Sequence, residues 1–331
     1  MIIETRAFAR AGLLGNPSDG YFGKTISICV RNFGAQVSLY HSPELCIEES
    51  AQGRNVFSSI YDLSDSIEAH GYYGADRLVK AAIKKFLAYC ESNQIRLESK
   101  NFTIRFSSSI PRQVGLAGSS AIITATMHAL MRFYNVKFPL EILPSLILSA
   151  EMEELGISAG LQDRVIQVYE GCVYMDFDQE FMNKHGHGVY NRINPALLPN
   201  LYIAYRTELS KVSGQVLNDI GVRYRQGDQA VISILNKIAG LAESGKQAIE
   251  TGDVETLNIL INENFNLREK IMNISTENKK MIETARNCGA SAKFAGSGGS
   301  IIGIYNGNDM LNQLIVEMKN IKARVIKPYI I

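Results

Sequence analysis

The sequence has few cysteines, almost no net charge and no long apolar run, and each shortage excludes a class of protein. Five scattered cysteines without a C-x-x-C pair argue against a disulfide framework or a zinc site, and for reduced thiols in the cytoplasm. A formal net charge of +1 gives no basic field for nucleic acid. No run approaches the length of a membrane span, and residues 1–10 lack the apolar core of a signal peptide. We therefore expect a cytoplasmic protein that binds neither nucleic acid nor membrane.

The composition is that of a globular protein, with 46% hydrophobic and 20% charged residues among 331. This length predicts two domains. A polar stretch between His185 and Pro199 is typical of a connection, so we place the domains at 1–195 and 196–331. A monomer or a homodimer is expected.

The most informative stretch runs from Pro111 to Ala121 and is rich in glycine and other small residues. It follows an alternating strand pattern over 102–107 and precedes a helical pattern over 121–134. Glycines allow a ligand close to the backbone, and the first N–H groups of a helix favour an anion such as phosphate. A simpler interpretation is a glycine-rich turn with Ser119 or Ser120 as helix cap.

Three charged residues occupy positions where the charge is expected to need a compensating group. Arg10 lies in a small, apolar run, where it either meets an acidic or phosphate group or extends outward to solvent. Glu151 shares a helical face with leucine and isoleucine, which favours a bound cation or a partly covered surface. Asp163 lies in the first turn of a helix expected over 158–171, where the helix dipole favours a carboxylate.

Hydrophobic periodicity predicts the remaining elements. We expect a strand pair over 26–40 that turns near residues 31–34, a helix over 74–91, a helix over 144–155, strands at 201–205 and 323–331, and helices over 216–251, 254–273 and 279–287.

Three further patterns resemble known sites and fail on inspection. Gly23-Lys24-Thr25 ends like a Walker A loop, but its first glycine would fall at Ser18. The glycines at 296–299 lack the third glycine of a dinucleotide fingerprint, which would be Ile301. The histidines at 185 and 187 have no acidic or cysteine partner at ligand spacing nearby.

The run from Pro111 to Ala121 resembles the second motif of the GHMP kinases, P-x-x-x-G-L-x-S-S-A, with one extra small residue. Residues 7–19 resemble the first motif of that family and residues 289–305 its third. Over 110–121 and 160–171 the similarity is greatest to the glucuronokinase branch. The resemblance implies an α+β fold of two domains: an amino-terminal mixed-sheet domain like that of ribosomal protein S5, and a ferredoxin-like carboxy-terminal domain.

The resemblance also implies roles for single residues. Asp163 would be the general base or charge stabiliser, and Arg10 would keep it ionised. Mg²⁺ would lie on Ser120 and Glu151, with Glu153 as a less favoured substitute. ATP would be bound by Pro111, Gly115, Leu116, Ala117, Gly118, Ser119, Ser120 and Ala121, and the substrate by Asp19, Arg164, Gly296, Ser297 and Gly298.

The activity that the resemblance implies is phosphorylation of D-glucuronate by ATP at the anomeric hydroxyl. The substrate carboxylate needs a cation, and Arg112, Arg164, Lys24 and Lys211 are equal candidates. Another sugar anomeric kinase, acting on galacturonate or a neutral hexose, is the alternative within the same chemistry. A sensor that binds sugar and ATP without turnover is the alternative from a different class.

Overall fold

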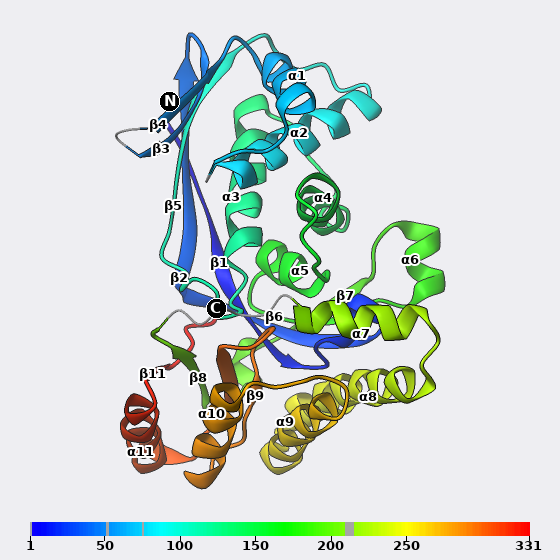
Figure 1. The fold of residues 1–331 in the computed structure, drawn as a ribbon, viewed down its shortest axis with the longest axis vertical. Coiled ribbons are helices and arrows are strands. Elements are labelled where there is room, and N and C mark those ends of the chain that lie inside the picture. Colours follow the sequence, from blue (N-terminus) through cyan, green and yellow to red (C-terminus); the bar gives the residue numbers. More distant parts are fainter. Residues whose placement is uncertain (1, 51–52, 75, 209–214) are drawn as a thin grey trace. The chain divides into compact units, whose positions relative to one another are not determined.

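The computed structural model describes residues 2–50, 53–74, 76–208 and 215–331, and these form two compact units (Figure 1). Unit 1 consists of Met1–Ala9, Phe33–Ile110 and Gly118–Val168. Unit 2 consists of Arg10–Asn32, Pro111–Ala117 and Tyr169–Ile331. The units are therefore not two consecutive parts of the chain, and the boundary that we place at residue 195 stays a prediction. Strands β1 (Ile2–Leu14) and β2 (Lys24–Ser42) each run from one unit into the other.

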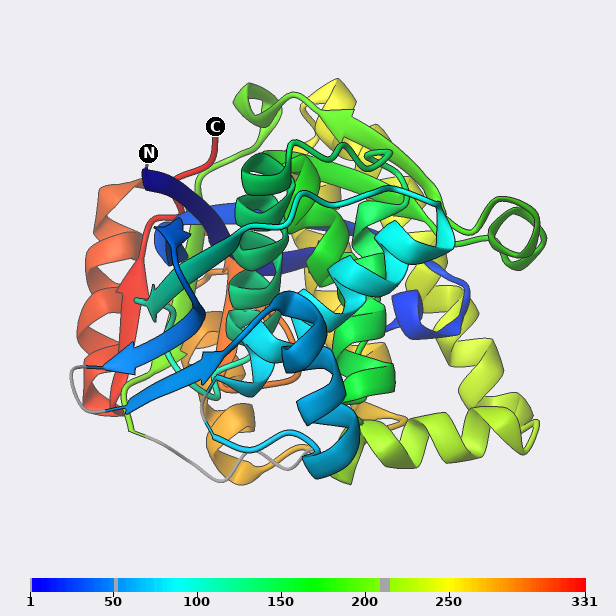
Figure 2. The ribbon, with the colours of Figure 1, turned by 90° about the horizontal axis from the view of Figure 1, so that it is seen from above.

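Unit 1 combines a mixed sheet with helices. Its strands follow the order β4-β3-β5-β2, with β3 parallel to β5 and the other two pairs antiparallel, and β1 also pairs with β2. Figure 2 shows α2 beside α3, and the two helices pack on each other. The further elements are β3 (Leu45–Ser50), β4 (Gly53–Phe57), α1 (Ile60–His70), α2 (Arg77–Ser92), β5 (Asn101–Ser108), α3 (Gly118–Tyr134), α4 (Leu143–Ser149), the π-helix η2 (Ala150–Glu154) and α5 (Gln162–Tyr169).

Alternation in β5 builds the core of unit 1. Phe102 and Ile104 are fully buried, as the predicted strand pattern requires, but Thr103 is buried too and Phe106 is half-buried, so the alternation is only partial. The ring of Phe102 meets that of Phe133 from α3 edge to face at 5.4 Å, and Phe86 from α2 stacks on Tyr134 at 5.7 Å. These contacts hold α3 against the sheet and α2 against α3.

The strand pair predicted over 26–40 is wrong, because β2 is one continuous strand. Its first part, from Lys24 to Ile28, pairs with β6, and its last part, from Ala35 to Ser42, pairs with β5. At the expected turn, Gly34 stays in the strand, where a Cβ would lie 3.2 Å from the Ala7 carbonyl oxygen of β1. The glycine thus serves close approach of two backbones and makes no turn.

Unit 2 contains a four-stranded antiparallel sheet of order β11-β8-β10-β9, as expected for a ferredoxin-like domain. Tyr202, Phe294 and Ile301 from this sheet share a core with Ile282 of α10 and Leu314 of α11. The elements of unit 2 are η1 (Ser18–Tyr21), β6 (Cys172–Asp176), α6 (Gln179–His185), β7 (Val189–Ile193), η3 (Pro195–Leu197), β8 (Leu201–Arg206), α7 (Gln215–Arg225), α8 (Gln229–Thr251), α9 (Val254–Glu269), α10 (Thr276–Asn287), β9 (Lys293–Phe294), β10 (Ser300–Ile304), α11 (Gly307–Asn320) and β11 (Ala323–Ile326).

The helix predicted over 216–251 is two helices, α7 and α8. Gly227 adopts a φ of 77° after α7, and the Asp228 carboxylate accepts hydrogen bonds from the N–H groups of Ala230 and Val231 at the start of α8. A left-handed glycine followed by an aspartate cap ends one helix and begins the next. Within the described ranges, no helix has both the length and the apolar character needed to cross a membrane.

Candidate active site

The predicted phosphate loop leads directly into a helix, as expected. Helix α3 begins at Gly118, three residues earlier than predicted, so both serines of the loop lie in its first turn. Before it, Gln113, Gly115 and Ala117 all have positive φ, at 59°, 70° and 62°. Alternating the sign of φ turns successive N–H groups to one side, and such backbone concavities and helix N-termini favour anions. The boundary between the two units falls at the start of α3.

In unit 2, this loop packs backbone against backbone on the glycine-rich turn after β9. A Cβ on Gly296 would lie 2.1 Å from the Gly115 carbonyl oxygen, and one on Gly115 would lie 2.9 Å from the Gly298 carbonyl oxygen. A Cβ on Gly299 would lie 3.0 Å from the Cα of Val114. Only glycine fits at such distances. The second and third predicted motifs therefore meet through positions that cannot carry a side chain.

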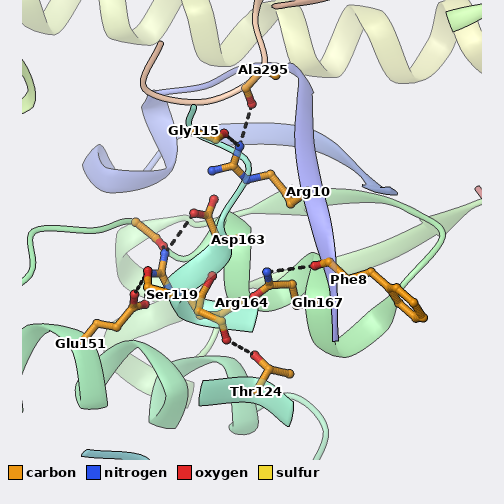
Figure 3. Close-up of polar contacts among 12 residues, drawn as sticks. Phe8, Arg10, Gly115, Ser119, Thr124, Glu151, Asp163, Arg164, Gln167 and Ala295 are labelled. Atoms are coloured by element: carbon orange, nitrogen blue, oxygen red, sulfur yellow. Dashed lines mark hydrogen bonds and ion pairs between the residues drawn. The ribbon is translucent and has the colours of Figure 1, made fainter. Parts of the chain in front are cut away.

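Arg10 is the cation that ties these two loops to β1 within unit 2. Its side chain is buried, and Nη1 donates to the carbonyl oxygens of Gly115 at 3.0 Å and Ala295 at 2.7 Å (Figure 3). Its backbone N–H donates to Leu116 at 3.2 Å. The guanidinium is buried and does not extend to solvent, and the predicted acidic or phosphate partner stays a prediction. Its predicted effect on Asp163 stays a prediction.

In unit 1, the carboxylate of Glu151 is wholly buried beside the start of α3. The Ser119 hydroxyl donates to its Oε1 at 2.6 Å, and Nη2 of Arg164 donates to its Oε2 (Figure 3). Glu151 belongs to η2, a π-helical turn that follows α4, and such turns often carry functional residues. The buried position favours the partnered interpretation of Glu151 over a surface glutamate, and Glu153 is exposed.

Arg164 links Glu151 to the start of α5. Its Nη1 donates to the Gly160 carbonyl oxygen at 2.7 Å and lies 3.4 Å from Oδ2 of Asp163. The guanidinium of Arg164 thus contacts both the predicted metal ligand Glu151 and the predicted catalytic carboxylate Asp163. Helix α5 begins at Gln162, later than predicted, so Asp163 is its second residue.

Arg164→Gln is expected to destabilise the protein by about 3–5 kcal/mol, because it leaves the buried Glu151 carboxylate without its cation. The double variant Glu151→Gln, Arg164→Gln should recover most of that loss, since no buried charge remains. Urea unfolding in EDTA measures both effects without any bound metal. The single variant Glu151→Gln completes the cycle, and if the losses of the two single variants simply add in the double variant, the pair is not coupled as its geometry requires.

The donors near Glu151 suit magnesium held together with a nucleotide. Hydroxyl and carboxylate oxygens are the ligands that Mg²⁺ prefers, and it usually takes one or two carboxylates plus phosphate oxygens. Among the described residues, no group of three or more His, Cys, Asp or Glu side chains could hold a metal by itself. Ser120 is fully buried next to Ser119 in the first turn of α3. The set fits a metal that arrives with phosphate.

The other predicted substrate residues lie in unit 2, apart from Arg164. Asp19 is half-buried in η1, and its charge together with burial raises the pKa of Tyr21 to about 12. Lys24 forms ion pairs with Glu243 at 3.1 Å and Asp176 at 3.6 Å. Arg112 is exposed in the loop. Lys211 lies outside the described residues. Ionic partners thus already engage Lys24 and Arg164.

Sequence reasoning missed two buried cations in unit 2, Arg268 of α9 and Lys293 of β9. Lys293 lies in a small, apolar run between Ala292 and Phe294, whereas Arg268 follows Leu267 and precedes Glu269 and Lys270. The same signal drew attention to Arg10. Arg268 gave no such signal within the helix predicted over 254–273, because arginine is an ordinary residue on helix surfaces.

Comparison with known proteins finds two family models in chain order. The one described as GHMP kinases N terminal domain matches residues 77–171, and the one described as GHMP kinases C terminal matches residues 246–321. Glucuronokinase 1 of Arabidopsis thaliana is 44% identical over 306 residues, which cover 91% of this chain and 84% of that protein. Probable glucuronokinase 2 of the same plant is 46% identical over 308 residues, with the same coverage.

A solved structure agrees in fold. The mevalonate kinase of Methanococcus jannaschii superposes with a TM-score of 0.76, over 100% of this chain and 98% of that one, at 20% sequence identity. At that identity the likeness concerns the fold alone.

Proposed function

The chain belongs to the GHMP kinase family, and from this premise we propose that it is an ATP-dependent sugar kinase that phosphorylates D-glucuronate at its anomeric hydroxyl. Two relatives named as glucuronokinases, 44% and 46% identical over most of the chain, support that substrate. The observation that carries the proposal is the buried Glu151 carboxylate bonded to Ser119 at the N-terminus of α3. A helix start favours phosphate, and a buried carboxylate beside bound phosphate would need a cation between the two negative charges.

The proposed mechanism assigns work to few groups. Backbone N–H groups of the loop and the first turn of α3 bind the phosphates of ATP. Ser120 and Glu151 would hold Mg²⁺, which when bound would offset the charge of the phosphates. Asp163 orients the anomeric hydroxyl and accepts its proton as the oxygen attacks the terminal phosphorus, while the bond from that phosphorus to the bridging oxygen breaks and ADP leaves. Phosphoryl transfer depends chiefly on position and charge, so no covalent intermediate with the protein is required.

Arg164 and Ser119 hold the side chain of Glu151, and Arg164 also contacts Asp163. Arg164 keeps Glu151 compensated while no metal is present, and its contact with Gly160 fixes the chain that leads into Asp163. Asp19 and the turn from Gly296 to Gly298 would bind the sugar, as the family resemblance implies.

Removing both metal ligands tests the magnesium assignment. Ser120→Ala with Glu151→Gln should shift the magnesium titration of activity to higher concentration, because neither remaining side chain replaces the lost oxygens. Binding of a fluorescent ATP analogue at fixed magnesium provides a second readout that does not depend on turnover. The chain contains no tryptophan, so its own emission does not interfere. Titrations that coincide with those of the unmodified protein would remove both residues from the metal site.

A coupled ADP-release assay over a panel of sugars tests the function as a whole. We expect turnover with D-glucuronate and lower rates with galacturonate and neutral hexoses. Turnover that favours another sugar would keep the chemistry and change the substrate. If no sugar supports ADP release while one still raises the melting temperature, the protein is a sensor and the kinase proposal fails.

A further inference from the structure

Three buried cations in unit 2 converge on three consecutive carbonyl groups. Lys293 donates from Nζ to the Phe294 carbonyl oxygen at 2.8 Å, Arg10 from Nη1 to that of Ala295 at 2.7 Å, and Arg268 from Nη1 to that of Gly296 at 2.8 Å. All three side chains are at most 5% exposed. The cations come from β9, β1 and α9, and together they surround the turn that begins at Gly296.

Carbonyl dipoles satisfy hydrogen bonds and do not cancel net charge. Among the residues that the structure describes, neither Arg268 nor Lys293 has a carboxylate within 4.0 Å. Burying cations without an anion is costly, and it is usually relieved by a partner or by a ligand. Burial lowers the pKa of Arg268 to about 10, and the charge of Asp19 partly offsets that effect. With a pKa still well above neutral, Arg268 is therefore a buried cation without a carboxylate partner in the described part of the chain, and the charge of Asp19, a predicted sugar-binding residue, acts on it.

The donors of Lys293 are already in use. An ammonium group has three N–H donors. Its Nζ donates to the carbonyl oxygens of Gly12 at 2.7 Å and Phe294 at 2.8 Å, and to Oδ1 of Asn16. Lys293 therefore has no donor left for a ligand.

Arg268 has N–H donors that make no hydrogen bond within the described part of the chain. A guanidinium has five N–H donors, and in the described part of the chain two are used: Nη1 bonds Gly296, and Nε contacts the Met272 sulfur at 2.9 Å. Nη2 makes no hydrogen bond there. Its planar form matches a carboxylate better than any other side chain. The Phe294 ring, 5.3 Å from the guanidinium carbon, holds the group in place.

We propose that Arg268, through Nη2, binds the carboxylate of the uronic acid substrate beside Asp19, and so selects an acidic sugar over a neutral one. The inference rests on the proposed function and names a residue outside the four cations considered from sequence. Asp19 would bind a hydroxyl of the same sugar. Burial and the charge of Asp19 raise the pKa of Tyr21 to about 12, and the charge of Arg268 acts against them.

The experiment compares D-glucuronate with D-glucuronamide, which has the same shape and no charge. Binding is measured by calorimetry without nucleotide, and kcat/KM by ADP release. Arg268→Gln should weaken glucuronate binding by about 10²-fold, as when one partner of a buried charge pair is removed, and leave glucuronamide binding unchanged. Arg268→Lys should fall between, because it keeps the charge and loses the planar geometry.

Arg286 of α10 offers a matched control. Its guanidinium lies 5.2 Å from the ring of Phe265, much as Arg268 lies over Phe294. It donates to Asn262, Asn266 and Ala292, so its nitrogens are all engaged. Arg286→Gln should lower the melting temperature and leave the ratio of glucuronate to glucuronamide affinity as it was.

Equal weakening of both ligands by Arg268→Gln, or unchanged glucuronate affinity, would overturn the inference. So would an unmodified protein that binds no glucuronate. If that protein binds glucuronate but turns over no sugar, the proposed function fails by itself. Selective loss of glucuronate binding in Arg268→Gln would then still support the carboxylate site.

Discussion

Replacement of Asp163 by Asn is expected to lower kcat by about 100-fold or more while ATP binds almost as tightly as before. Asparagine has the same shape, so the first turn of α5 and the neighbouring Arg164 keep their places. It cannot accept the proton of the acceptor hydroxyl, and it removes the negative charge 3.4 Å from Nη1 of Arg164. Steady-state ADP release gives kcat, and calorimetry with ATP gives the dissociation constant.

The same change at Asp309 is the control, because that exposed aspartate also lies in the first turn of a helix, α11. Asp309→Asn should leave both measurements unaltered. An Asp163→Asn enzyme with full turnover would reject the base assignment. A loss of ATP affinity as large as the loss of kcat would instead mean that Asp163 organises the nucleotide site.

Gly296→Ala is expected to abolish measurable ATP binding or folding. The new Cβ would lie 2.1 Å from the Gly115 carbonyl oxygen and 2.8 Å from Nη1 of Arg10. Backbone cannot move aside as a flexible side chain can, so the two glycine-rich loops must separate. Overpacking alone costs about 1–3 kcal/mol, and here the displaced loop is the proposed phosphate site. Circular dichroism and binding of an ATP analogue measure the two consequences.

Gly240 serves as the control for an added methyl group. It lies within α8, and a Cβ there would meet no heavy atom within 4 Å. Gly240→Ala should stabilise the protein by about 0.5–1 kcal/mol, since alanine favours helix and glycine does not. Normal ATP binding by Gly296→Ala would show that the two loops do not depend on each other.

Local sequence patterns predicted most elements, and their failures have a common cause. Strand β5 and helix α3 follow from alternation and from apolar content, which depend on neighbouring residues. The false turn at 31–34 and the fused helix over 216–251 arose where one glycine was misinterpreted. Gly34 serves close packing against β1, whereas Gly227 ends a helix, and both look alike without their surroundings.

For the candidate site, patterns identified the loop and the unusual positions of Arg10, Glu151 and Asp163. They did not reveal that Arg164 pairs with Glu151 thirteen residues away, and they left Arg164 as a candidate for the substrate. They also passed over Arg268. A charged residue on a helix is ordinary in sequence and becomes informative only when its burial and partners are known.

The sequence by itself determined most of the elements, the glycine-rich loop before α3 and the resemblance to the family, because these reside in short runs whose chemistry is local. Only the tertiary structure decided which charges are buried together. Arg10 donates to a carbonyl group 285 residues away and Lys293 to one 281 residues away. A buried charge is compensated by whatever the fold brings near it, and contacts between such distant residues leave no pattern along the chain.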